Sequence, residues 1–462
     1  MEQINQFLSN ISEYLWSAPF ALLLLGTGVF LTFRLLFIQF RGFKHGVEIV
    51  SGKYDNPANK GQLTHFQALT TALSATIGIG NIGGVATAIY YGGPGAIFWM
   101  WISALFGMAI KYTSCTLAIK YRKIDDDGNV RGGPMYFIEL GMSKKFKPLA
   151  YLFAACTAIA AFGAGNMVQS NTVAHSLVSA FHVSPEMNGI VRWIIGIALS
   201  IMVGIVIIGG IKRIGHFTAW LVPLMSILYI GSALVIIFMN LDKLGPAFKL
   251  IFHYAFNPSA AVGGFAGAMV RQTIEWGLKR GLFSNESGLG SAPMAHSTAK
   301  VDEPIREGLV AMLGPFIDTI VICTMTALVI ILSGQWNSGI NGAPLTAAAF
   351  NSALPVFGQW MVVVGILLFA YSTAISWSYY GEKGIEYLGG KKAKSPYRWV
   401  YLLFTLIGAR LDLKAAWSFA DIANALMAIP NLVALIGLSG VIAALTKKYF
   451  KEKAQGLQQP YK

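Results

Sequence analysis

The sequence predicts an all-α integral membrane protein with about eleven transmembrane helices. Of its 462 residues, 55% are hydrophobic and only 12% are charged, and the mean hydropathy is +0.57. The apolar residues gather in runs of about 20, the length that an α-helix needs to cross the hydrocarbon core of a bilayer. Soluble domains contain about 25% charged residues, so the composition excludes that class.

The apolar runs follow one another along the chain. They cover residues 16–40, 66–91, 95–122, 149–181, 189–209, 214–240, 262–300, 307–333, 358–387, 397–409 and 418–446. The run at 397–409 is too short to span the membrane on its own. The segment before the first run lacks the basic stretch and the cleavage site of a signal peptide. We therefore expect an extra N-terminal helix at 16–40, within a single membrane domain that covers 1–462.

Lysine and arginine residues fall mainly in alternate gaps between these runs. The basic gaps contain Arg41, Lys44, Lys53, Lys60, Arg122, Lys123, Arg131, Lys144, Lys145, Lys147, Lys212, Arg213, Lys391, Lys392, Lys394 and Arg398. By the positive-inside rule these gaps are cytoplasmic, the N-terminus is outside, and residues 447–462 form a cytoplasmic tail. In one such gap, residues 132–139 (GGPMYFIE) predict a short interfacial helix. The net charge of +14 is thus a topology signal and does not indicate nucleic-acid binding.

A glycine-rich stretch interrupts the second run. Residues 76–84 read TIGIGNIGG, with glycine at 78, 80, 83 and 84. Each glycine in a helix interior costs about 0.8–1 kcal/mol relative to alanine, so four discourage a continuous helix by about 3–4 kcal/mol. A break inside the bilayer survives only where its free backbone groups find partners in protein or in a wet cavity. A bound ion and a polar solute would provide such partners.

A second interruption divides the chain into two similar halves. Residues 281–293 read GLFSNESGLGSAP inside the run at 262–300. A surface loop with ordinary turn chemistry would explain this segment alone. However, both interruptions fall in the first helix of a five-helix set, at 66–240 and at 262–446. Paired interruptions of this kind are typical of transporters with inverted repeats, whose binding site lies where the repeats meet.

The motifs resemble those of the alanine or glycine:cation symporter family, sodium-coupled carriers of small amino acids. The resemblance rests on residues 92–107 (GGPGAIFWMWISALFG), on both interruptions, on the turn that begins at Gly132, and on residues 166–169 (NMVQ). It covers nearly the whole chain and implies the leucine-transporter fold, a 5+5 inverted repeat whose first and sixth core helices are broken. Two positions depart from the family pattern: Ile79, where a threonine is expected, and Ser114, where a glutamate would pair with Lys111.

A zwitterionic amino acid needs donors for its carboxylate and acceptors for its ammonium group. The N-terminus of the half-helix near Gly80 offers free N–H groups and a positive dipole end. Carbonyl oxygens released at the two breaks would accept from the ammonium group. Gln169 would add an amide contact, unless it serves only as an interhelical hydrogen bond. The expected substrate-binding residues are Thr76, Gly78, Gly80, Asn81, Gln169, Phe283 and Trp377. Phe283 and Trp377 would close a pocket of alanine size.

Sodium prefers hard oxygen ligands such as carbonyl and hydroxyl groups. The resemblance to the ion site of this fold implies four ligand residues, namely Ile77, Gly80, Ala370 and Thr373. A threonine in a membrane helix otherwise bonds its own helix. Proton-driven relatives of the fold replace the ion with a lysine on the fifth core helix, but residues 215–238 contain no lysine or arginine. The cotransported ion is therefore expected to be Na+, with proton coupling as the alternative.

Among the acidic residues inside the apolar runs, Glu286, in the second interruption, and Asp318, in the next helix, are the main candidates. Ionisable residues at this depth are candidates for a functional role, and either residue could shape an ion site or carry a proton. Glu286 could instead only cap the helix that follows. The sequence thus predicts a sodium-coupled importer of small neutral amino acids in the cell membrane. A channel is the weaker alternative, an intramembrane enzyme would need a catalytic constellation that the sequence lacks, and no motif indicates an oligomer.

Overall fold

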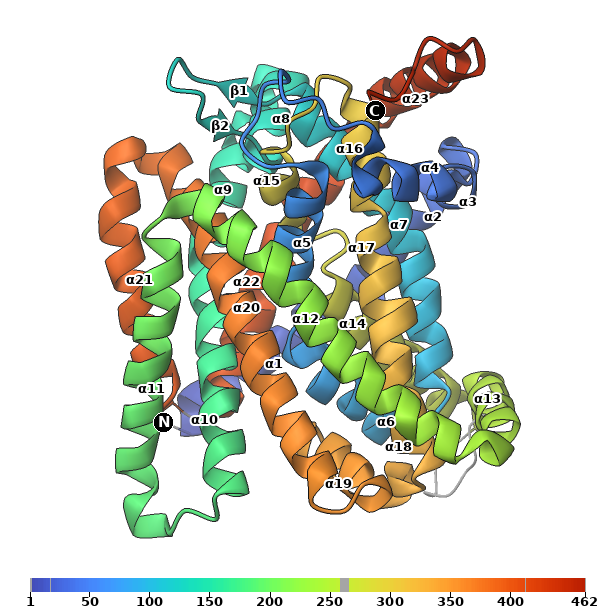
Figure 1. Cartoon of the computed structure of the whole chain (residues 1–462), viewed down its shortest axis with the longest axis vertical. Coiled ribbons are helices and arrows are strands. Elements are labelled where there is room, and N and C mark those ends of the chain that lie inside the picture. The colour runs from blue at the N-terminus through green and yellow to red at the C-terminus, as the bar shows by residue number, and fades with distance from the viewer. Residues whose placement is uncertain (1, 17, 258–265, 412, 462) are drawn as a thin grey trace.

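The computed structural model describes residues 2–16, 18–257, 266–411 and 413–461. These residues form a helical bundle (Figure 1), with one two-stranded antiparallel sheet in which Lys123 pairs with Arg131. The first half contains α1 (Glu2–Leu15), α2 (Ala18–Arg34), α3 (Ile38–Arg41), α4 (Phe43–Glu48), η1 (Ile49–Lys53), α5 (His65–Thr76), η2 (Gly80–Gly84), α6 (Val85–Gly92), α7 (Ala96–Lys120), β1 (Lys123–Ile124), β2 (Val130–Arg131), α8 (Pro134–Gly141), η3 (Lys144–Phe146), α9 (Lys147–Phe162), η4 (Gly163–Met167), α10 (Val168–Ala180), α11 (Pro185–Ile207), α12 (Gly210–Met239) and α13 (Leu241–Phe256).

The second half begins after the undescribed residues 258–265. It contains α14 (Ala266–Asn285), α15 (Ala292–His296), α16 (Pro304–Ala311), α17 (Leu313–Pro315), η5 (Phe316–Cys323), α18 (Thr324–Leu332), η6 (Gln335–Asn337), α19 (Ala343–Ala353), α20 (Phe357–Gly389), η7 (Lys391–Ala393), α21 (Lys394–Gly408), α22 (Leu413–Gly437) and α23 (Ser439–Ala454). The predicted short helix after Gly132 is α8. It is largely buried and packs on α9.

Seven helices in the described part of the chain are long and apolar enough to cross a membrane, and the bent pair of α5 with η2 and α6 makes an eighth. The chain is therefore a multi-pass membrane protein. The remaining three predicted spans are shorter or broken. The run at 16–40 becomes α2, which ends at Arg34; the run at 262–300 is divided between α14 and α15, with its first residues outside the described part; and the run at 397–409 lies in α21.

Other boundaries also differ from those predicted. The run at 418–446 divides into α22 and α23, so helix continues to Ala454 within the predicted tail. Helices α1, α13 and α19 were not predicted. The helix α13 is amphipathic, with charged residues among its apolar ones, and α19 has only 11 residues. Hydropathy alone finds long apolar spans and does not detect short or amphipathic helices.

The first break lies within the glycine-rich stretch at residues 76–84, as the sequence predicts. The helix α5 begins at a capping box in which Thr64 and Gln67 bond one another's backbone N–H groups. It ends at Thr76, and the chain resumes as helix at Gly80 with a bend of 53° between the two parts. The break between them, residues 77–79, is fully buried. The predicted interruption of this membrane helix is confirmed.

The second break is also present, but it begins later than predicted. The helix α14 continues through Gly281 to Asn285, and α15 begins at Ala292. Between them Gly288 and Gly290 adopt positive φ angles of 99° and 85°, a conformation that suits residues without a Cβ. Gly281 stays helical because it packs closely on α7, where an added Cβ would meet the Ser103 side chain.

The two breaks lie against α20, a 33-residue helix whose middle is buried. This helix packs on α5, α9, α10 and α12. The strands and the helices α8, α15 and α16 lie at one end of the bundle, and α13 and α19 lie at the other (Figure 1). The breaks are therefore held midway between the two ends.

A polar cluster closes the end of the bundle at which α15 and α16 lie. The Glu307 carboxylate contacts Nδ1 of His65 on α5 and, at 2.6 Å, Nδ1 of His296 on α15, and all three side chains are buried. Nearby, the Arg122 guanidinium donates hydrogen bonds of 2.6–2.9 Å to the backbone carbonyls of Lys60, Ser297, Ala299 and Val301. These contacts tie the start of α5 to α15 and α16 at this end of the bundle.

Candidate binding site at the two breaks

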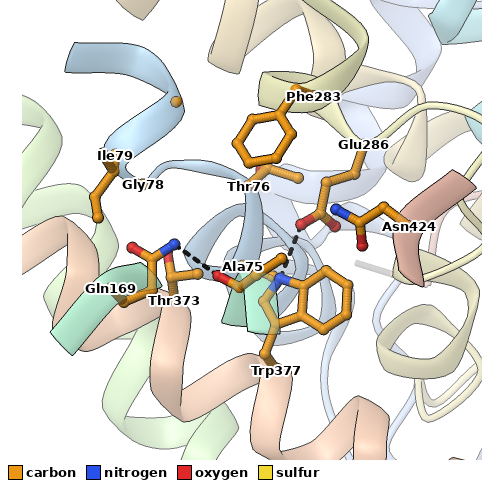
Figure 2. Close-up of a pocket in the computed structure, with 12 residues that line it drawn as sticks. Ala75, Thr76, Gly78, Ile79, Gln169, Phe283, Glu286, Thr373, Trp377 and Asn424 are labelled. Atoms are coloured by element: carbon orange, nitrogen blue, oxygen red, sulfur yellow. Dashed lines mark hydrogen bonds between the residues drawn. The ribbon is translucent and has the colours of Figure 1, made fainter. Parts of the chain in front are cut away.

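A small cavity lies between the first break and the last turn of α14 (Figure 2). It is lined by Ala75, Thr76, Gly78, Ile79, Gly80, Ala164, Gln169, Phe283, Glu286, Thr373, Trp377 and Asn424. Its volume of about 20 Å³ is enough for about one water molecule. An amino acid would therefore enter only when the surrounding side chains move apart.

Glycine allows the two breaks to approach closely. A Cβ at Gly80 would lie 3.3 Å from the Cα of Ser284 and 3.5 Å from the Phe283 ring. A Cβ at Gly78 would lie 2.7 Å from the Thr373 hydroxyl oxygen on α20, which is closer than side-chain atoms tolerate. The glycines therefore do more than interrupt the helix, because they let α14 and α20 contact the backbone of the break.

At the first break the cavity is lined by carbonyl groups from the end of α5 on one side and by N–H groups from the start of η2 on the other. The carbonyl end of α5 stops at Thr76, and the half-helix that starts at Gly80 lacks a full preceding turn to accept its first N–H groups. One of these groups, the Asn81 N–H, donates to the Gly78 carbonyl at 3.2 Å, and the Gly78 N–H in the break donates to Oδ1 of Asn81 at 2.8 Å. The helix starting at Gly80 thus suits an anionic group, and the end of α5 suits a cationic one.

Two amide side chains add acceptors to the cavity wall. Gln169 donates from Nε2 to the Ala164 carbonyl at 2.9 Å, which leaves its Oε1 buried and without a partner among the described residues. Oδ1 of Asn424, on α22, is buried and unbonded in the same way. Unpaired buried acceptors are costly, so a ligand ammonium group would gain from bonding them. Asn424 was not predicted, although it is one of two asparagines in the apolar run at 418–446, with Asn431, and this was a usable signal.

Glu286 and Trp377 lie with Asn424 on the side of the cavity opposite Gln169 (Figure 2). The indole Nε1 of Trp377 donates to the Glu286 carboxylate at 2.8 Å, and the Ser291 hydroxyl donates to its other oxygen at 2.5 Å. Phe283 completes the wall, and its ring lies 5.1 Å from that of Trp417. Glu286 does more than cap a helix, because its hydrogen bond to Trp377 holds in place an aromatic side chain of the cavity wall.

The predicted ion ligands lie where α20 meets the end of α5. The Thr373 hydroxyl is 3.2 Å from the Ser74 carbonyl oxygen and 3.4 Å from that of Ile77. Ala370 precedes Thr373 by one turn and is buried. Thr373 and Gly80 line the cavity, whereas Ile77 and Ala370 lie outside its wall. In the described part of the chain no group of three or more His, Cys, Asp or Glu side chains could hold a metal.

Asn81 has a different position from the one expected. Its side chain lies outside the cavity wall, is fully buried, and donates from Nδ2 to the Asp318 carboxylate at 2.7 Å. Ser284 and Thr319 donate to the other carboxylate oxygen at 2.9 and 2.7 Å. The geometry therefore does not support substrate contact by Asn81. Instead Asn81 and Asp318 connect the first break to the last turn of α14 and to η5.

Lys111 and Ser114 lie together on α7. Ser114 bonds only within its own helix, to the Lys111 carbonyl oxygen at 3.1 Å. Lys111 is 4% exposed and makes no ion pair within 4 Å among the residues described. Its electrostatic partners are Glu286 and Asp318.

Comparison with known proteins identifies the family. A model of the sodium:alanine symporter family matches residues 1–462. The chain belongs to this family. It is 48% identical over 448 residues to the sodium/alanine symporter AgcS of Methanococcus maripaludis, covering 96% of each protein. It is 36% identical to the amino-acid carrier protein AlsT of Bacillus subtilis, covering 100% of this chain and 96% of AlsT. The resemblance predicted from the motifs is confirmed, and the protein is a transporter.

A solved structure shows the same fold. The crystal structure of MhsT in complex with L-phenylalanine matches this symporter-family chain with a TM-score of 0.57 and 13% sequence identity, over 84% of this chain and 99% of MhsT. This neighbour has the leucine-transporter fold. The predicted fold type is confirmed at this level, while the number of helices and the repeat boundaries stay predictions.

Replacing Gln169 with leucine should raise the KM for alanine about ten-fold in this family member. The leucine has nearly the same size but removes the free Oε1, and a hydrogen bond to a charged group contributes about 1.5–3 kcal/mol. Initial rates of uptake in proteoliposomes would measure the change. Gln39→Leu is a matched control, because the Gln39 amide is also buried with an unbonded Oε1 but lies outside the cavity. An unchanged KM in Gln169→Leu would mean that Gln169 only bonds Ala164.

Proposed function

We propose that the protein is a symporter that imports small neutral amino acids, such as alanine or glycine, together with Na+ by alternating access. Membership of the sodium:alanine symporter family supports a cation-coupled amino-acid carrier. The similarity to the sodium/alanine symporter AgcS supports the choice of alanine and sodium. The amino acid bound to MhsT supports a substrate of the same chemical class.

One structural observation carries the proposal. The two broken helices meet at a cavity that offers the start of a half-helix, two unbonded amide oxygens, and the Thr373 hydroxyl beside backbone carbonyls. The half-helix near Gly80 would bind the carboxylate, and the oxygens of Gln169 and Asn424 would accept from the ammonium group. The ion would bind on the other side of Gly78, between α5 and α20.

The oxygen-rich surroundings of Thr373 favour Na+ over a proton. Carbonyl and hydroxyl oxygens are hard ligands that coordinate Na+ without changing their own charge. Residues 215–238, in α12, contain no lysine or arginine that could take the place of the ion. Proton coupling is the second candidate, because the Glu286 carboxylate lies in the cavity wall.

The closed cavity favours small substrates. Phe283 and Trp377 leave little room beside the first break. Each additional methylene changes binding by only about 1–3 kcal/mol through apolar contact, so larger side chains would be excluded mainly by their bulk. Glycine and alanine should therefore compete well for uptake, and leucine should not.

We further propose the topology that the charge distribution predicts. The end of the bundle with α15, α16 and the strands would face the cytoplasm, and the end with α13 and α19 would face outside (Figure 1). The repeats would cover residues 66–240 and 262–446, after an extra N-terminal helix in α2. Each repeat would then begin with a broken helix, and alternating access would move the two repeats around the cavity.

Uptake of labelled alanine into proteoliposomes tests the function. We expect saturable uptake that an inward Na+ gradient drives and that glycine inhibits. An inward proton gradient without Na+ should give no accumulation. Uptake that ignores Na+ and follows the proton gradient would exclude the proposed coupling, and uptake that does not saturate would indicate a channel.

A further inference from the structure

Arg280 lies on α14, one turn before the cavity residue Phe283, and three aromatic rings surround it. Its guanidinium carbon is 5.3 Å from the centre of the Trp276 ring, 5.9 Å from that of Phe283, and 5.4 Å from that of Trp417. Trp276 and Phe283 belong to α14, and Trp417 belongs to α22. Aromatic faces attract a cation and hold it in place, so the position of this side chain is well defined.

The guanidinium has no hydrogen-bond acceptor within the described residues. Arg280 makes no hydrogen bond or ion pair there, and its Nε is buried and unbonded. The side chain as a whole is partly exposed. Its main electrostatic attraction is to Asp421 on α22, which makes no ion pair with it within 4 Å. A guanidinium keeps its charge in proteins, so this cation remains available to a carboxylate from solution.

The acid that attracts Arg280 is itself engaged elsewhere. One Asp421 oxygen accepts from the Ser12 hydroxyl at 3.3 Å, and the Trp16 indole donates to the Asp421 backbone carbonyl at 2.9 Å. Ser12, on α1, thus holds one oxygen of Asp421, and the other oxygen, Oδ1, is buried and has no partner among the described residues. This arrangement keeps the carboxylate near Arg280 without neutralising it in a direct ion pair.

Arg280 also stands at the edge of the cavity. Phe283 lines the cavity and its ring packs against that of Trp417 at an interplanar angle of 38°, while Asn424, two turns after Trp417, lines the same cavity from α22. The first half of α14 contacts the end of α6, where Thr273 donates to the Gly92 carbonyl at 2.8 Å. Arg280 therefore lies on the side of the cavity that faces away from the closed cluster around Glu307, which is the outer side in the proposed topology.

We propose that Arg280 binds the carboxylate of an incoming amino acid at the outer edge of the cavity, before Phe283 and Trp417 move to admit it. The inference rests on the proposed function and extends it to the entry step. A guanidinium binds a carboxylate with two parallel hydrogen bonds. A positive charge at an entrance also raises the association rate of anionic groups, and salt weakens this effect. Arg280 would thus select solutes with a free carboxylate over amines and amides.

The test uses the full-length protein in proteoliposomes with a fixed Na+ gradient. The KM and maximal rate for external alanine are measured at low and high ionic strength, adjusted with choline chloride. We expect Arg280→Gln to raise KM about ten-fold, to change the maximal rate less than two-fold, and to remove the rise of KM with salt. Arg280→Lys should keep the salt dependence. Arg271→Gln should match the wild type, because Arg271 lies on the same helix, is 72% exposed and pairs with Glu275.

The outcomes separate this inference from the proposed function. Wild-type protein without Na+-driven uptake would refute the function itself. Na+-driven uptake with a KM that does not vary with salt would refute the role of Arg280, even if Arg280→Gln cannot be purified. A variant that lowers only the maximal rate, with KM and its salt dependence unchanged, would show that Arg280 serves only to pack α14 against α22.

Discussion

Replacing Thr373 with alanine should raise the Na+ concentration needed for half-maximal alanine uptake at least ten-fold. The Thr373 hydroxyl lies within 3.4 Å of the carbonyl oxygens of Ser74 and Ile77, so its removal would delete one hard ligand from the proposed ion site. A ten-fold loss corresponds to about 1.4 kcal/mol, which is within the usual contribution of a hydrogen bond or ligand of this kind. The measurement is the uptake rate as a function of external Na+.

Two variants control for effects on packing. Thr373→Ser restores the hydroxyl and should recover most of the sodium affinity. Thr405→Ala removes another buried hydroxyl, one that bonds only the Tyr401 carbonyl of its own helix at 3.2 Å, and it should leave the sodium response unchanged. If Thr373→Ala kept the wild-type sodium response, Thr373 would not be a ligand of the coupling ion.

Replacing Asp318 with alanine should destabilise the folded protein by about 3–5 kcal/mol. The fully buried carboxylate accepts from Asn81, Ser284 and Thr319. Its removal leaves three buried donors without their acceptor, and each such loss costs about 1–3 kcal/mol. The costs are not additive, since the donors share one acceptor. Thermal unfolding in detergent would show a lower midpoint, and alanine uptake should fall because the first break loses its link to α14.

Asp318→Asn should be less damaging, because an asparagine keeps the shape and one acceptor oxygen. Asp126→Ala is a suitable control, since Asp126 is exposed in the turn between the two strands. A melting temperature and an uptake rate for Asp318→Ala equal to those of the control would show that the bonds around Asp318 do not support the break.

The sequence predicted those parts of the fold that have a local cause. Four glycines within an apolar run disfavour a continuous membrane helix, and the structure breaks this helix at residues 77–79, although Gly80, Gly83 and Gly84 themselves stay helical. Gly281 shows the limit of this logic. A glycine can either break a helix or allow two helices to pack closely. At Gly281 the close contact with Ser103 on α7 shows that the glycine serves packing. The start of the second break therefore could not be read from composition.

The candidate site was predicted in part for similar reasons. Thr76, Gly78, Gly80, Gln169, Phe283, Thr373 and Trp377 line one cavity. Their roles as ligands stay predictions. Asn81 belongs to the same motif but turns toward Asp318, a residue more than 200 positions later. Asn424 and Arg280 lie near the cavity only because α22 packs close to α14 in the folded protein. Pairings between distant segments have no local signature in a single sequence.

An experimental structure of the protein with alanine and Na+ bound would test the central claim most directly. We expect density for the amino acid between the half-helix at Gly80 and the amides of Gln169 and Asn424, with the ion beside Thr373 and the carbonyl of Ile77. We expect the volume of the cavity to be larger than its present value of about 20 Å³. Alanine bound at a site that contacts neither break, with the two broken helices unchanged, would contradict the proposal.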